Sequence, residues 1–141
     1  MLENLRGALA GGKLPGMDIG TTETSAGRRF AEALGAKDFE GIATLLDQAI
    51  DFRGLTPRRN WEAANPAEVD AILRQWFEPS DRIDEIVEIE EGGISDRGRV
   101  AYRFRGENED GPFVVEQQAY FTEREGRIDW MRILCSGFRP V

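Results

Sequence analysis

The segment GPFVVEQQAYF, from Gly111 to Phe121, alternates like a β-strand but carries a polar residue on its apolar face. Side chains on a strand point to opposite faces with period two. That period places Gln117 on the same face as four apolar side chains, which are Phe113, Val115, Ala119 and Phe121. We therefore expect a strand with one buried face, and on that face a single amide that needs a hydrogen-bonding partner.

The composition is that of one acidic globular domain. The chain has 141 residues, of which 40% are hydrophobic and 31% are charged, and its formal net charge is −8. A chain of this length can bury a core without disulfide bonds. The negative charge predicts no nucleic-acid partner, because phosphates require a basic surface, and no attraction to an anionic membrane. No window approaches the roughly 20 apolar residues of a membrane span.

The cysteine and histidine counts narrow the chemistry further. Cys135 is the single cysteine, and the opening segment MLENLRGALAGGKLPG lacks the apolar stretch of a signal peptide, so we expect a cytoplasmic protein with an inert thiol. The absence of histidine excludes histidine-based triads and histidine metal motifs. We expect neither a metal nor a cofactor.

The first half of the chain predicts an arm and then helices. Residues 1–20 are rich in glycine and proline and predict a flexible arm, followed by a domain at 21–141. Helical spacing begins near Thr24 and resumes after Asp38, which can serve as an N-cap. The segment NPAEVDAILRQWF gives the strongest helix signal, because Asn65 can cap and Pro66 suits the first helical position.

The remaining segments predict strands. A short strand is expected at AIDFRG, residues 49–54, and four strands are expected at 83–91, 98–106, 112–123 and 127–138. Glycine-bearing turns separate the last four. Helices first and an antiparallel meander last predict an α+β fold.

The final strand, RIDWMRILCSGF, is apolar on both faces. Period two places Ile128, Trp130 and Leu134 on one face, and Met131, Ile133 and Cys135 on the other. Helices can cover only one side of a sheet, so the other side needs a second cover. A homodimer that packs sheet against sheet is the simplest such cover.

Two segments of the sequence resemble the nuclear transport factor 2-like superfamily, which includes SnoaL-like proteins and ketosteroid isomerase. RRFAEALGAKDFEGIATLLDQAIDFRGLTP resembles its opening helices and first strand, and EGRIDWMRILCSGFRP resembles its final strand. The resemblance covers roughly residues 24 to 139. It implies a curved antiparallel β-sheet wrapped around three N-terminal helices as a cone with an apolar pocket. It leaves the function open, because this scaffold hosts isomerases, cyclases, epoxide hydrolases and simple binders.

The resemblance also implies a role for Gln117. Its amide would project into the pocket near the position of the protonated acid of ketosteroid isomerases, where an N–H donor can orient a ligand. At three positions, this chain lacks the catalytic residue that the superfamily carries. The general base corresponds to Arg53, a helix tyrosine corresponds to Phe30, and an epoxide hydrolase carboxylate corresponds to Ile133. Met131 matches an apolar lining position.

Four further residues are candidates from their own chemistry. The planar fork of Arg53 can anchor an acid or carbonyl group, although Asp51 on the same strand face can instead pair with it. Tyr102 can donate a hydrogen bond. Asp129 can face inward, or it can lie at the rim because it follows a turn.

Two tryptophans are expected to cover the mouth of the cone. Trp76 recurs at helical spacing, which also fits a core position, and Trp61 is expected in a loop. The adjoining TPRRN segment, residues 56–60, could form a mobile lid.

These residues support three hypotheses. The first is a domain that binds a small hydrophobic molecule bearing a carbonyl, hydroxyl or acid group, oriented by Gln117 and Arg53. The second is a cofactor-independent isomerase, cyclase or hydratase that uses Asp51 or Asp129 as general base, with Gln117 and Tyr102 as donors. The third is a protein-interaction or structural dimer module.

Overall fold

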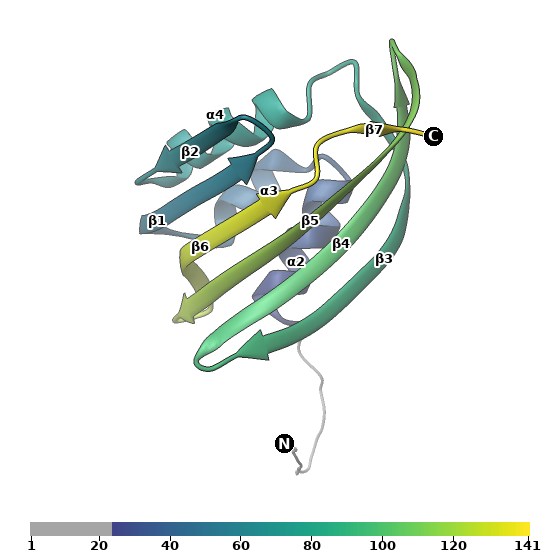
Figure 1. Ribbon diagram of the computed structural model, residues 1–141. Helices are drawn as coiled ribbons and strands as arrows, with labels where there is room; N and C mark the ends of the chain where they lie inside the picture. Colours follow the sequence, from purple (N-terminus) through teal and green to yellow (C-terminus); the bar gives the residue numbers. More distant parts are fainter. Residues whose placement is uncertain (1–23) are drawn as a thin grey trace.

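The computed structural model describes residues 24–141. The predicted arm at 1–20 lies outside the described residues. The described part forms one α+β unit in which a curved, unclosed sheet wraps around helices on one side (Figure 1). This confirms the predicted fold class.

The elements are labelled as in Figure 1. Within residues 24–141 the helices are α2 (Ala26–Gly35), α3 (Phe39–Thr44) and α4 (Pro66–Trp76). The strands are β1 (Leu46–Thr56), β2 (Arg59–Ala63), β3 (Arg82–Ile94), β4 (Arg97–Asn108), β5 (Gly111–Arg124), β6 (Arg127–Cys135) and β7 (Arg139–Pro140). The sheet order is β2-β1-β6-β5-β4-β3, with β7 paired to β5. Neighbouring strands are antiparallel except β1 and β6, which are parallel.

Side-chain caps start all three of these helices. The side chain of Ser25 accepts a hydrogen bond from the backbone N–H of Arg28, and Asp38 and Asn65 cap α3 and α4 in the same way. Each cap satisfies a backbone N–H that has no partner within its helix. The caps predicted at Asp38 and Asn65 are confirmed. None of the helices within residues 24–141 is long and apolar enough to cross a membrane.

The segment predicted as a loop and lid is instead an edge strand. Arg59–Ala63 forms β2, which pairs with β1 through a turn at Pro57 and Arg58. The indole N–H of Trp61 donates to Thr56 Oγ1 at 2.8 Å, and the guanidinium of Arg59 lies 3.6 Å from the centre of the Trp61 ring. The prediction that Trp61 lies in a loop is wrong, because ladder and side-chain bonds make this segment a strand paired with β1.

A β-bulge in β6 changes which residues face the helices. Thr122 pairs with Trp130 and Glu123 pairs with Ile128, so Asp129 is an extra residue in the ladder. Ile128 therefore lies buried on the inner side with Met131, whereas Trp130 is only half-buried. The prediction that Ile128 shares a face with Trp130 and Leu134 is wrong, because the bulge breaks the period of two.

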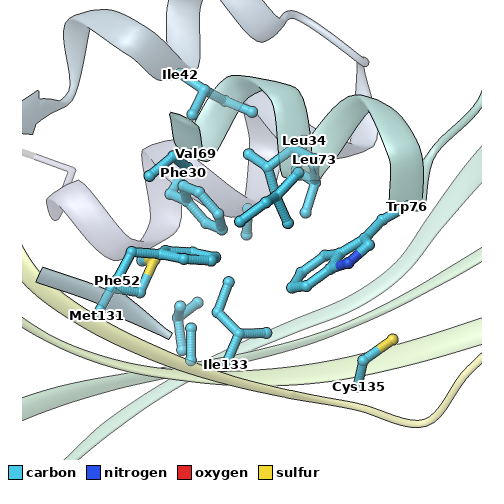
Figure 2. Packing of buried hydrophobic residues seen from close by; sticks show 14 of the residues in the cluster. Phe30, Leu34, Ile42, Phe52, Val69, Leu73, Trp76, Met131, Ile133 and Cys135 are labelled. Atoms are coloured by element: carbon cyan, nitrogen blue, oxygen red, sulfur yellow. The ribbon is translucent and has the colours of Figure 1, made fainter. Parts of the chain in front are cut away.

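The core fills the space between the helices and the inner face of the sheet (Figure 2). Helix α4 contributes Trp76, whose ring lies over Gly54 of β1. A Cβ atom at Gly54 would lie 2.6 Å from the Trp76 ring, so the glycine is what allows this contact. The Trp76 ring also packs against Phe52 and Trp61, with centroid distances of 6.2 and 6.0 Å. Phe30 and Met131 lie fully buried in the same core.

Candidate functional site

Gln117 lies on the inner face of β5 and is 3% exposed. The residues beside it on that face, Val115 and Ala119, are buried, as the alternation predicted. Its Oε1 accepts a hydrogen bond of 2.6 Å from the Tyr102 hydroxyl on the neighbouring strand β4. Its Nε2 is buried and has no hydrogen-bond partner in the described residues. The amide oxygen thus accepts one hydrogen bond, and the amide N–H group has no partner among the described residues.

The amide belongs to a row of side chains that crosses three strands. Gln117 pairs with Tyr102 on one side and with Cys135 of β6 on the other. The surroundings of the row are apolar. The Tyr102 ring stacks on Phe104 at 5.1 Å and lies 6.5 Å from the Phe30 ring.

Trp76 supplies a second buried donor without a partner. Its side chain is 8% exposed, and its Nε1 makes no hydrogen bond in the described residues. In Figure 2 the indole nitrogen lies on the edge of the ring turned toward Cys135, the strand neighbour of Gln117. Within residues 24–141, these two nitrogens are the buried side-chain polar atoms that have no partner. Helical spacing predicted the position of Trp76 and gave no signal for its free N–H.

Tyr102 is a neutral donor in this setting. Burial raises the pKa of its phenol well above the ordinary value, with a further contribution from Cys135. The protonated hydroxyl is what holds the Gln117 oxygen.

The two predicted general bases lie away from this row. Asp51 faces outward on β1, where its Oδ1 lies 3.2 Å from the guanidinium of Arg132. Asp129 occupies the bulge, where it accepts a hydrogen bond of 2.6 Å from the Thr122 hydroxyl. The one buried acid within residues 24–141 is Asp81, which accepts from the Glu78 backbone N–H at 2.9 Å. Its role is to close the turn after α4.

Arg53 is also separated from Gln117. It is exposed between the buried residues Phe52 and Gly54, so its side chain lies on the outer face of the sheet. The prediction that Gln117 and Arg53 orient one ligand is wrong, because odd and even positions of β1 face opposite sides.

The outer face of the sheet carries a groove of about 450 Å³ that runs over β2, β1, β6 and β5. Its lining includes six outward residues, Arg53, Leu55, Glu62, Tyr120, Arg132 and Leu134. Leu55 and Leu134 are 48% and 55% exposed. Nearby, the guanidiniums of Arg97 and Arg132 lie over the Trp130 ring.

Among the described residues, no group of three or more Cys, Asp or Glu side chains is arranged to hold a metal ion. Cys135 is a buried free thiol whose Sγ accepts from the Gly137 N–H at 3.3 Å.

The fold is shared with several solved structures. A candidate isomerase from Rhodopseudomonas palustris matches with a TM-score of 0.65 at 22% identity, covering 83% of this chain and 93% of that one. A hypothetical protein with a ketosteroid isomerase-like fold from Catenulispora acidiphila, solved with trimethylamine, matches at 0.62 and 13% identity, covering 82% and 88%. A nuclear transport factor 2-like protein from Burkholderia xenovorans matches at 0.57 and 17% identity, covering 79% and 86%.

Comparisons of sequence alone add nothing to this likeness. No family model matches the chain, and no curated protein matches it. The structural matches show that the chain has the nuclear transport factor 2-like cone fold, as its sequence predicted.

The buried phenol predicts an alkaline titration. In a Tyr120→Phe variant, Tyr102 is the one remaining tyrosine. Because its folded pKa is raised, the folded chain keeps its proton at about pH 10, where an unfolded tyrosine releases it. The free energy of unfolding is therefore expected to fall as pH rises through that value, and phenolate absorbance should appear only with unfolding. Reversible ionisation near pH 10 in a folded protein, seen by circular dichroism, would contradict this placement of Tyr102.

Proposed function

We propose that this domain, which has the nuclear transport factor 2-like cone fold, binds one small, largely apolar molecule beside Gln117 on the inner side of its sheet, where side chains of the core move aside to admit it. The observation that carries the proposal is the pair of buried donors, Gln117 Nε2 and Trp76 Nε1, that lack partners in an apolar interior. Leaving a buried donor unsatisfied costs roughly 1–3 kcal/mol. An acceptor atom of a ligand, or a buried water, would satisfy these donors.

The positions of the acids favour binding over acid–base catalysis. Asp51 is paired with Arg132 on the outer face, and Asp129 is engaged by Thr122 in the bulge. Tyr102 stays protonated at neutral pH and so can donate but cannot act as a base. The alternative of an isomerase, cyclase or hydratase would need a base that these side chains do not place beside Gln117.

The inner side also lacks a cation for an acidic ligand. Gln117 and Asp81 are the buried polar residues within residues 24–141, and neither is cationic. An ionised acid buried without a counter-charge is strongly disfavoured. The ligand class therefore narrows to neutral molecules.

Binding can be tested by protein-observed NMR with a set of small neutral aromatic and alicyclic compounds. Compounds that bind are expected to shift the side-chain resonances of Gln117 and Trp76. An Ile133→Phe variant should weaken this binding, because Ile133 is buried on the inner face and a larger side chain takes up space there.

Leu134→Phe is the matched control, because the neighbouring residue faces outward. It should leave binding unchanged, with folding of both variants checked by circular dichroism. Compounds that shift only resonances around the outer groove would contradict the proposal.

We propose in addition that the outer face joins two copies of the chain into a homodimer. Leu55 and Leu134 expose apolar side chains there, and the groove between the strands is open to a partner surface. The isologous contact of a two-fold dimer would cover both copies at once. This face, rather than the inner one, would serve a protein-interaction role.

Sedimentation equilibrium tests the dimer. The unchanged chain is expected to sediment as a dimer at micromolar concentration, and Leu134→Glu is expected to sediment as a monomer, because it places a charge in the apolar contact. Ile94→Glu is the control, since Ile94 is 61% exposed at the far end of β3. A monomeric unchanged chain, or a Leu134→Glu variant that remains dimeric, would contradict this interface.

We also infer a cytoplasmic location, because the single cysteine is a free thiol. Fractionation of cells that express the protein tests this, and recovery in an extracytoplasmic fraction would contradict it.

A further inference from the structure

We propose that the groove on the outer face of the sheet binds a small carboxylate that carries a hydrocarbon tail. The charged head lies between the guanidiniums of Arg53 and Arg132. The tail lies over the side chains of Leu55 and Leu134. This site is separate from the inner side of the sheet, and it gives Arg53 the anchoring role for an acid that its chemistry predicted.

The register of β1 and β6 places a charged row of side chains beside an apolar row. Arg53 pairs with Arg132 across the two parallel strands, and Leu55 pairs with Leu134 two residues further along. All four residues line the groove of about 450 Å³. Two residues along a strand span about 7 Å, so the rows lie one short hydrocarbon chain apart. The groove thus has a charged end and an apolar end.

Arg53 is a cation that lacks a bound counter-charge. It takes part in none of the ion pairs found within residues 24–141. Glu62 lies directly across from it on β2, but the two side chains do not form an ion pair. Like charges that face each other on paired strands are destabilising. A carboxylate between Arg53 and Arg132 would offset their repulsion.

Arg132 is held in place and still has donors to offer. Its Nη1 donates to the backbone oxygens of Asp51 and Met131, each at 3.0 Å. The same nitrogen lies 3.2 Å from the Asp51 carboxylate, and the guanidinium lies over the Trp130 ring. These contacts use one nitrogen of a group that has five N–H donors. Nε and Nη2 can therefore donate to a ligand carboxylate, which favours such planar pairing.

The apolar row is flanked by neutral residues. Asn60 pairs with Leu55 on one side, and Gln118 pairs with Leu134 on the other. Both leucine side chains are exposed, so a hydrocarbon tail that covers them removes apolar surface from water. A carboxylate without a tail, or a tail without a carboxylate, would use only one end of the groove.

Three probes test the two ends separately in NMR titrations of the unchanged chain. Hexanamide has the tail of hexanoate without the charge, and acetate has the charge without the tail. Hexanoate is expected to bind about fivefold more tightly than hexanamide, which is the worth of an exposed ion pair, and about tenfold more tightly than acetate. It should shift the methyl resonances of Leu55 and Leu134 and the Nε–H resonance of Arg53. Added salt should reduce the preference over hexanamide.

Variants assign the preference to the arginine. Arg53→Gln is expected to weaken hexanoate binding about fivefold and to leave hexanamide binding unchanged. Arg105→Gln is the control, because it makes the same change in net charge at an exposed position of β4 that does not line the groove. Glu62→Gln should strengthen hexanoate binding about twofold, since it removes a competing carboxylate. Circular dichroism establishes that each variant is folded.

Several results would overturn this site. They are no binding of hexanoate, equal affinity for hexanoate and hexanamide, or an effect of Arg105→Gln as large as that of Arg53→Gln. Because the tail covers the leucines of the proposed homodimer contact, saturating hexanoate is also expected to shift the chain from dimer to monomer in sedimentation equilibrium. A dimer that persists at saturation would overturn the placement of the tail. A chain that is monomeric without hexanoate contradicts the homodimer alone, and the titrations then still decide the site.

Discussion

The hydrogen bond from Tyr102 to Gln117 determines the chemistry of the inner side of this sheet. It joins two buried polar side chains on neighbouring strands, and burial keeps its phenol protonated. The amide oxygen accepts in this bond, and the amide nitrogen is buried without a partner among the described residues. The Trp76 indole adds a donor of the same kind. The interior is therefore apolar and contains two buried N–H donors that have no partner among the described residues.

Because side chains alternate along each strand, the buried Gln117 and the charged side chains lie on opposite faces of the sheet. Along β1, Phe52 and Gly54 face the helices, whereas Asp51 and Arg53 face outward. The carboxylates and guanidiniums of the outer face pair with each other across strands, as Arg132 does with Asp51 and Arg103 with Glu88. These paired charges are thus kept on the outer face, and the inner face of the sheet carries neutral polar groups. One sheet in this way carries its ion pairs on the outer face and its buried amide on the inner face.

The sequence predicted those features that depend on a short stretch of chain. Period two placed Gln117 inside, and local capping patterns placed Asp38 and Asn65 at helix starts. Features that depend on two distant segments were missed. The bulge at Asp129 arises from the register between β5 and β6, and β2 owes its existence to pairing with β1. The free N–H of Trp76 could not be predicted either, because it depends on what the folded neighbours fail to offer.

A crystal structure of the purified protein at about 1.2 Å or better, where amide oxygen and nitrogen can be told apart, tests the central claim most directly. The account predicts that Gln117 Oε1 faces the Tyr102 hydroxyl, and that density for a ligand atom or a water lies within hydrogen-bonding distance of Nε2. Nitrogen facing Tyr102, or a Gln117 side chain turned to the outer face, would contradict it.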